Sequence, residues 1–145
     1  MTPRVHAAFA LAASAVVAAA LAWGFYLVGS PMDRRQVRFD EQRLQDLQTI
    51  AREIRQMVVD SHGDKNELKE ALPKTLAEAV ERARGQQINS LDPDTGAPYE
   101  YTVKNDSTFE VCAQFARSRD WDSDVFWNHP AGRHCYTINV LDPPP

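Results

Sequence analysis

The feature that most constrains this chain is a long uncharged run near its N-terminus. From Val5 to Gly29 the sequence contains no Asp, Glu, Lys or Arg. As a helix rising ~1.5 Å per residue, such a run exceeds the roughly 30 Å hydrocarbon core of a bilayer. Trp23 and Tyr26 stand near its far end, where amphipathic rings prefer the membrane interface. The run therefore predicts a transmembrane anchor over residues 1–30.

A cleaved signal peptide is the alternative to a retained anchor. Ala20-Leu21-Ala22 resembles the small-residue site at which signal peptides are cut. The apolar run continues through Val28, however, and is longer than an ordinary signal-peptide core. We therefore favour a single-pass anchor, and the chain's 145 residues then leave one domain, residues 31–145.

Charge excludes some partners and suggests another. The formal net charge of −4 argues against nucleic acid, because phosphate binding needs a basic surface. Arg34, Arg35 and Arg38 cluster just past the apolar run, where membrane lipid head groups are the simplest partner.

The side of the membrane is contested by two signals. Because cytoplasmic flanks are rich in Arg and Lys, these three residues and Arg43 favour a cytoplasmic domain. The only two cysteines, Cys112 and Cys135, instead favour one disulfide in an oxidising compartment. We favour the extracytoplasmic side, while two unpaired buried thiols remain the alternative.

A long amphipathic helix is predicted from Ser30-Pro31-Met32-Asp33 to about Asp60. The first four residues offer a cap, a proline suited to the first turn and an acid at the positive end of the dipole. Apolar residues then recur every three or four positions: Val37, Leu44, Leu47, Ile50 or Ala51, Ile54, and Met57 or Val58. The predicted polar face carries Arg43, Gln45, Asp46, Arg52, Glu53 and Arg55. We interpret the apolar stripe as domain core, with a partner-binding groove as the alternative.

A shorter helix follows. Ser61-His62-Gly63-Asp64 is predicted to end the long helix, and Leu72-Pro73-Lys74-Thr75-Leu76 to open the next. Leu76, Val80 and Ala83 are expected to face inward, with the end near Gly85.

The remaining sequence alternates with the period of a strand. After the turn signal Asp92-Pro93-Asp94-Thr95-Gly96, apolar and polar residues alternate over 99–103, 109–115 and 135–140, with a hairpin turn at 104–107. The chain is therefore predicted to have an α+β fold, in which the long helix packs on a small antiparallel sheet.

Strand parity places both cysteines on one side of this sheet. Phe109, Val111 and Phe115 share one face, so Cys112 lies on the other, and Cys135 is likewise opposite Tyr136. If the two strands are antiparallel neighbours, a cross-strand disulfide follows, closing a loop of roughly 24 residues.

The loop from Ala116 to His134 is the candidate interaction site. It lacks periodicity and contains Trp121, Phe126, Trp127 and His129, and long irregular loops are often functional. Exposed aromatic rings there suit a protein interface, while rings folded back over a thin sheet are the alternative.

Metal and catalytic sites have little support. Asp120, Asp122 and Asp124 alternate like the start of a calcium loop, but Val125 and Ala131 stand where its glycine and final glutamate belong. Calcium is kept as a weak candidate beside a solvated acidic loop, and no other cofactor is expected. We find no catalytic constellation, and predict a non-enzymatic protein without a small-molecule substrate.

The order of these parts resembles a known family. An apolar helix runs into an amphipathic one, followed by Leu72-Pro73-Lys74-Thr75-Leu76 and then by Asp92-Pro93-Asp94-Thr95-Gly96-Ala97-Pro98-Tyr99-Glu100-Tyr101 before a small sheet. This order is similar to that of type IV pilins and type II secretion pseudopilins. The resemblance implies a pilin-like fold in the bacterial inner membrane, with the domain in the periplasm.

Two family features are missing, and they shape the expected function. Prepilins carry a glycine before the cleaved bond and a glutamate soon after it, whereas this sequence has no such glycine near its N-terminus and no Glu before Glu41. We therefore expect a membrane-tethered accessory subunit of an integral membrane protein complex. A minor pseudopilin of a secretion or pilus system is the alternative.

Overall fold

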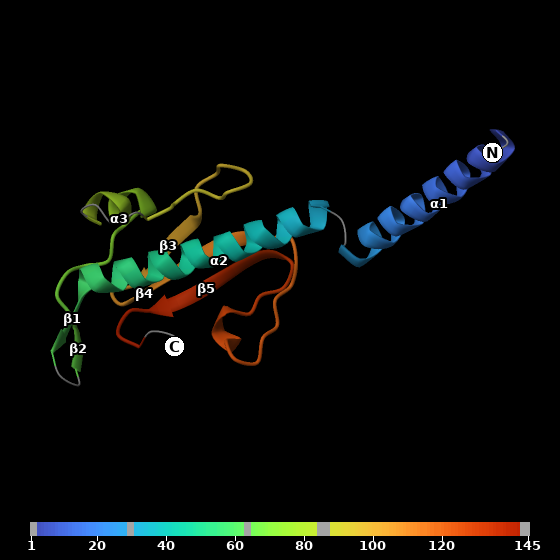
Figure 1. The fold of residues 1–145 in the computed structure, drawn as a ribbon. Coiled ribbons are helices and arrows are strands. Elements are labelled where there is room, and N and C mark those ends of the chain that lie inside the picture. The colour runs from blue at the N-terminus through green and yellow to red at the C-terminus, as the bar shows by residue number, and fades with distance from the viewer. Residues whose placement is uncertain (1–2, 29–30, 63–64, 84–87, 143–145) are drawn as a thin grey trace. The chain divides into compact units, whose positions relative to one another are not determined.

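The computed structural model describes residues 3–28, 31–62, 65–83 and 88–142. The chain divides into two compact units, residues 1–35 and 36–145, each taken here by itself. The division lies slightly beyond residue 30, where the sequence places the end of the anchor. Figure 1 gives the order of the elements along the chain.

The first unit contains helix α1, Pro3–Val28. Within it, 22 residues from Val5 to Tyr26 are long and apolar enough to cross a membrane, and none of this segment is buried in the protein. Phe9 and Leu11 are 75% and 72% exposed. Because a signal sequence has the same character, the helix itself agrees with either an anchor or a signal. The predicted cap at Ser30 lies outside the described residues.

Helix α2, Pro31–Val58, confirms the long amphipathic helix. Its predicted stripe is core from Leu44 onward, since Leu47, Ile50 and Ile54 are fully buried, but the prediction is wrong at Val37, which is 37% exposed. The predicted polar face is wrong at two positions, because Arg43 and Glu53 are also buried. Both residues adjoin the stripe, so the elements that cover it cover them too.

The end of α2 differs from the prediction. The helix stops at Val58, and strands β1 (Val59–His62) and β2 (Lys65–Leu68) form an antiparallel hairpin where a helix end was expected. The Lys69 backbone N–H donates to the Val58 carbonyl at 2.9 Å, satisfying one acceptor at the helix end. Two consecutive β-branched valines favour the switch to extended backbone at this point.

Helix α3, Leu76–Arg82, begins as predicted. The Thr75 hydroxyl caps it by accepting from the Glu78 N–H. Leu76 and Ala83 face inward as expected, but Val80 is exposed and Ala79 is buried in its place. The buried face follows a spacing of three and then four, which excludes Val80. The predicted end at Gly85 lies outside the described residues.

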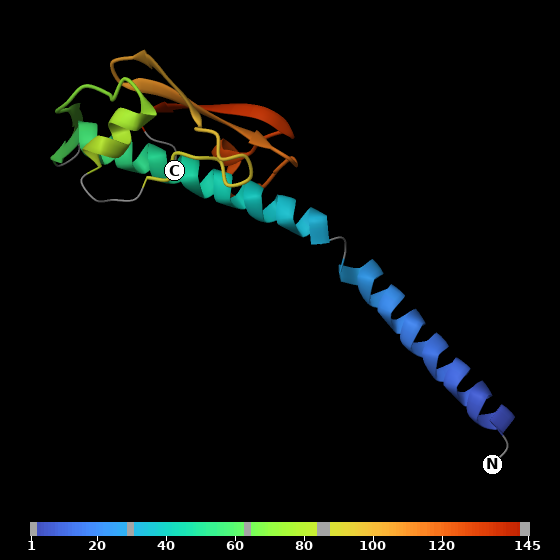
Figure 2. The same cartoon turned by 90° about the horizontal axis from the view of Figure 1, so that it is seen from above.

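Three antiparallel strands form the main sheet, in the order β3 (Glu100–Asn105), β4 (Thr108–Phe115) and β5 (Gly132–Asn139). The predicted strands are confirmed, although β5 begins at Gly132 rather than Cys135. In Figure 2, α2 runs along the sheet within the second unit. The domain is therefore α+β, with a long helix on a small antiparallel sheet.

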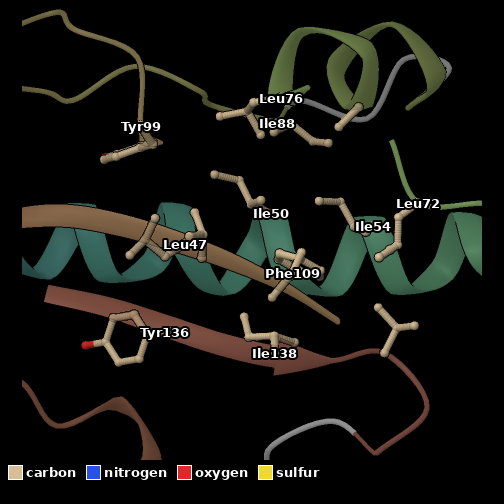
Figure 3. Close-up of a cluster of buried hydrophobic side chains, with 14 of the residues drawn as sticks. Leu47, Ile50, Ile54, Leu72, Leu76, Ile88, Tyr99, Phe109, Tyr136 and Ile138 are labelled. Atoms are coloured by element: carbon tan, nitrogen blue, oxygen red, sulfur yellow. The ribbon is translucent and has the colours of Figure 1, made fainter. Parts of the chain in front are cut away.

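The core lies between α2 and two neighbouring parts of the domain: the three-stranded sheet, and the segment that contains α3 and Ile88. Figure 3 shows α2 residues such as Ile50 between Phe109 and Ile138 of the sheet on one side and Leu76 and Ile88 on the other. Burying each large apolar side chain contributes about 1.5–3 kcal/mol relative to exposure. Because both neighbours depend on the same helical stripe, α2 organises the whole domain.

Candidate interaction site

The loop between β4 and β5 is tied to α2 at its first residues. The Asp40 carboxylate accepts hydrogen bonds from the backbone N–H groups of Ala116 and Arg117, each at 2.9 Å. Asp40 is buried, so these bonds satisfy a carboxylate that is removed from water. The loop therefore starts from a fixed point on the helix.

Most of the predicted aromatic residues cover the sheet. Trp127 is buried, and its ring centroid lies 4.8 Å from that of Tyr136. The Tyr136 hydroxyl donates to the Trp127 carbonyl at 3.0 Å. Phe126, which is partly buried, packs edge-on against Trp127 at 5.0 Å. These two predicted contact residues therefore follow the alternative interpretation, in which the rings complete the core.

His129 also faces inward. Its ring stacks on Phe115 with centroids 3.6 Å apart, and its Nδ1 lies 3.2 Å from the Pro130 carbonyl. Burial lowers the pKa of His129 below its ordinary value, although the contact with Pro130 opposes this. A neutral imidazole packed against a ring is a core element.

Trp121 is different because its ring is 59% exposed. The Arg119 guanidinium carbon lies 4.4 Å from the ring centroid, a cation–π contact. Arg119 in turn pairs with Asp124 at 2.8 Å, and the backbone N–H of Trp121 donates to the Asn128 side-chain oxygen at 2.8 Å. The exposed ring is therefore held in place before any partner arrives.

Trp121 borders an open groove of about 740 Å³ between the loop and the first turns of α2. The helix contributes Val37, Asp40, Glu41, Leu44, Gln45 and Gln48. The loop contributes Arg117, Ser118, Arg119, Asp120, Trp121, Asp124 and His129. Four carboxylates thus face two guanidiniums in an otherwise apolar and amide-lined groove, which gives it acidic character.

A buried ionic cluster adjoins the groove through Asp40. Arg43 donates to both oxygens of Asp92, at 2.5 and 3.0 Å, and to Asp40 at 2.9 Å. The hydrogen bond to Asp92 is the main cause that raises the pKa of Arg43. Burial alone would raise the pKa of Asp92, but hydrogen bonds from Arg43 and from two backbone N–H groups lower it to about 2. Arg43 and Asp92 are therefore both charged at neutral pH.

The same cluster holds the turn at residues 92–96. Asp92 accepts from the backbone N–H groups of Asp94 and Thr95 at 3.0 and 2.9 Å, and Gly96 adopts a φ of 69° that favours glycine. Beyond the turn, the Tyr99 hydroxyl donates to Asp46 at 2.8 Å. Sequence reasoning missed Asp40 and Arg43 as site residues. Their three-residue spacing was visible, but the decisive partner, Asp92, lies far along the chain.

The two cysteines form the predicted cross-strand disulfide. Cys112 and Cys135 are paired directly across β4 and β5, with Cα atoms 4.0 Å apart. Among the described residues, the one group with ligand atoms close enough for a metal joins Glu110 to these two sulfurs. Sulfurs in a disulfide are not thiolates, so this group is not a metal centre.

The calcium candidates do not converge. Asp120, Asp122 and Asp124 are absent from that group, although the structure describes all three. Asp124 is paired with Arg119, and Asp120 accepts only a long 3.4 Å bond from Asn128. Their arrangement is that of a solvated acidic loop.

Comparison of the chain with protein-family models, curated proteins and solved structures finds no match in any of the three.

Proposed function

We propose that this protein is a membrane-tethered, non-enzymatic interaction protein, an accessory subunit of an integral membrane complex, with its domain on the periplasmic side of a bacterial inner membrane. One observation carries the proposal: a single chain combines a fully exposed apolar helix with a disulfide-bonded domain. The helix supports attachment to a membrane, and the disulfide supports an oxidising compartment.

The exposed rings of α1 support a retained anchor. Trp23 and Tyr26 are 65% and 81% exposed, so the end of the helix presents large apolar surface that water disfavours. A bilayer accommodates this surface, with the two rings at its interface. Arg34, Arg35 and Arg38 follow closely in the sequence, a position at which cationic side chains favour attachment to anionic lipid head groups.

The disulfide outweighs the basic flank as a guide to orientation. The positive-inside rule is statistical, and it weighs few residues here. A disulfide is seldom stable in a reducing cytoplasm. Cys112 is buried and Cys135 is partly covered, so the bond is part of the folded sheet rather than an exposed reactive pair. This supports placing residues 31–145 outside the cytoplasm.

The groove supports a binding role. It offers a preordered, exposed Trp121 beside the aliphatic Val37, rimmed by charged residues. Tryptophan at the centre of a contact with a polar rim is typical of protein interfaces.

Extraction of the native protein tests the accessory role. Membranes are washed with alkaline carbonate, solubilised in mild detergent and sized without denaturation, and co-migrating proteins are identified by mass spectrometry. We expect the chain to stay with washed membranes and to co-migrate with a larger integral membrane complex. Release by carbonate contradicts the anchor, and migration without other proteins contradicts the accessory role.

Thiol labelling tests the compartment. Cells are treated with a membrane-permeant maleimide before and after reduction, and the chain's mass shift is measured. We expect no labelling of Cys112 or Cys135 until reduction. A matched Trp121→Cys variant should react with an impermeant maleimide in spheroplasts, whereas protection of that residue until lysis contradicts periplasmic placement.

A minor pseudopilin is the second candidate. It is favoured by the docking of the Asp92–Tyr101 element onto α2 through Arg43 and Asp46, a helix-and-sheet arrangement of the kind the family resemblance implies. N-terminal sequencing of the mature protein separates the candidates. A processed N-terminus that keeps the apolar helix favours the pseudopilin, and an intact Met1 favours the accessory subunit.

A further inference from the structure

The groove beside Trp121 has two properties that any occupant must match. It is acidic overall, with Glu41 and Asp120 exposed at its rim. Its walls also present apolar surface, since Val37 is 37% exposed and Trp121 is 59% exposed. A complementary surface therefore combines a small aliphatic patch with a flanking cation.

The first turns of α2 carry such a surface. Arg38 is exposed, and it lies next to Val37, which itself forms part of the groove wall. On a helix, Val37, Arg38 and Glu41 lie close together, because residues three and four apart share a face. One face of α2 thus presents an apolar centre, a cation and an anion within about one turn.

Such a face is self-complementary. We propose that two copies of the chain pair through this groove, with Val37 and Trp121 of the copies in contact and Arg38 of each copy paired with Glu41 of the other. A two-fold axis makes both charge pairs at once, as an isologous interface requires. The contact closes on itself and therefore gives a dimer rather than a filament.

Membrane attachment favours this contact, and in this respect the inference rests on the proposed function. Val37 lies 11 positions beyond Tyr26, the end of the membrane-span candidate. Anchoring in one bilayer therefore restricts the grooves of two copies to the same membrane surface. Confinement to the membrane also raises their effective concentration, so a small interface is sufficient for pairing.

The groove's other charged groups leave Glu41 accessible. Asp124 is occupied by Arg119, and Asp40 by Arg43 and two backbone N–H groups. Glu41 and Asp120 are both exposed, but only Glu41 lies on α2 three residues from Arg38, so a two-fold axis between two α2 helices places Glu41 opposite Arg38 of the other copy. This singles out the Arg38–Glu41 pair as the test of the proposal.

The first experiment places a photo-crosslinking p-benzoylphenylalanine at Trp121 in the full chain, in native membranes. We expect a crosslinked product with the mass of two copies, with peptides from α2 and the loop joined. Crosslinks to other proteins alone, or no crosslink, overturn the self-pairing.

Charge reversal gives the specific readout. Arg38→Glu and Glu41→Arg should each lower the yield of the two-copy product about five- to tenfold, because each places like charges opposite one another. The double variant should restore the yield, since it rebuilds the pair in the opposite sense. Glu81→Arg, at an exposed site on α3, is the matched control and should leave the yield unchanged.

The outcomes separate this inference from the proposed function. A double variant that stays as weak as the single ones overturns the Arg38–Glu41 pairing. A chain that remains in washed membranes and co-migrates with a larger complex, yet never crosslinks to itself, overturns the dimer and leaves the accessory role standing. Loss from washed membranes overturns both.

Discussion

Two acidic turns of similar composition have opposite environments in this domain. Asp92-Pro93-Asp94-Thr95-Gly96 begins with a buried carboxylate that binds a buried arginine. Asp120-Trp121-Asp122-Ser123-Asp124 stays at the surface, and its one strong ion pair, Asp124 with Arg119, is local. The difference comes from Arg43, which only the first turn reaches. The presence of acidic residues in a turn therefore does not show whether the turn is held by a buried ion pair or is a solvated loop.

The largest effect should follow loss of the shared cation. Arg43→Met keeps the aliphatic bulk but leaves Asp40 and Asp92 as buried carboxylates without their partner. We expect the free energy of unfolding to fall by about 3–5 kcal/mol, measured by urea denaturation of the full chain in detergent. Gln42→Met, exposed on the same helix, is the control and should change it by less than about 0.5 kcal/mol. Equal stability of the two variants would show that the ion pair between Arg43 and Asp92 does not stabilise the fold.

The second turn depends instead on a covalent closure. It lies inside the loop closed by Cys112 and Cys135, which are 23 positions apart. Replacing both cysteines with serine should lower the free energy of unfolding by about 3 kcal/mol on the chain-entropy model. Limited proteolysis should then cut within residues 116–131 sooner than within 92–96. Reduction of the wild-type protein should reproduce the result, and preferential cutting at 92–96 would reverse the comparison.

Acid should weaken the first turn selectively. The pKa of Asp92 is held at about 2 in the folded protein, below the ~3.9 of an unfolded chain. Between pH 4 and pH 2 the unfolded state therefore binds more protons, so stability present above pH 4 is lost as the pH falls. The loss from this residue is about 2 kcal/mol. Asp92→Asn should remove this part of the pH dependence, whereas Asp122→Asn should retain it. If the free energy of unfolding falls equally with pH for wild type and Asp92→Asn, the acid sensitivity does not come from Asp92.

The smallest effect is expected at the second turn itself. Asp122→Asn should change the free energy of unfolding by less than about 0.5 kcal/mol, because an exposed carboxylate is lost from a solvated loop. Added calcium or chelator should leave the Tm unchanged for the wild type and this variant. A rise in Tm with calcium that Asp122→Asn abolishes would make the second turn a metal site.

The sequence predicted those elements of the fold whose apolar residues recur with a regular period. Periodicity located α2 and the three strands. Strand parity placed Cys112 and Cys135 on one face of the sheet, and the pairing of β4 with β5 meets the condition for the expected disulfide. The hairpin at β1 and β2 was missed because its strands are only four residues each and follow a strong helical pattern.

The candidate site was less predictable. Arg43 was placed on a polar face because helical periodicity cannot reveal a carboxylate supplied by residue 92. Phe126, Trp127 and His129 were grouped with Trp121 by composition, but only their packing against Phe115 and Tyr136 separates them. Whether the loop binds a partner stays a prediction.

The bonds of Asp40 to Ala116 and Arg117 also have a mechanical consequence. Any pull transmitted through the N-terminal helix enters the domain at the start of α2. There, Asp40 and Arg43 already connect the helix to the end of β4 and to the turn at Asp92. Force is therefore shared with the sheet within about the first four turns of α2, and the helix resists being peeled away from its N-terminal end.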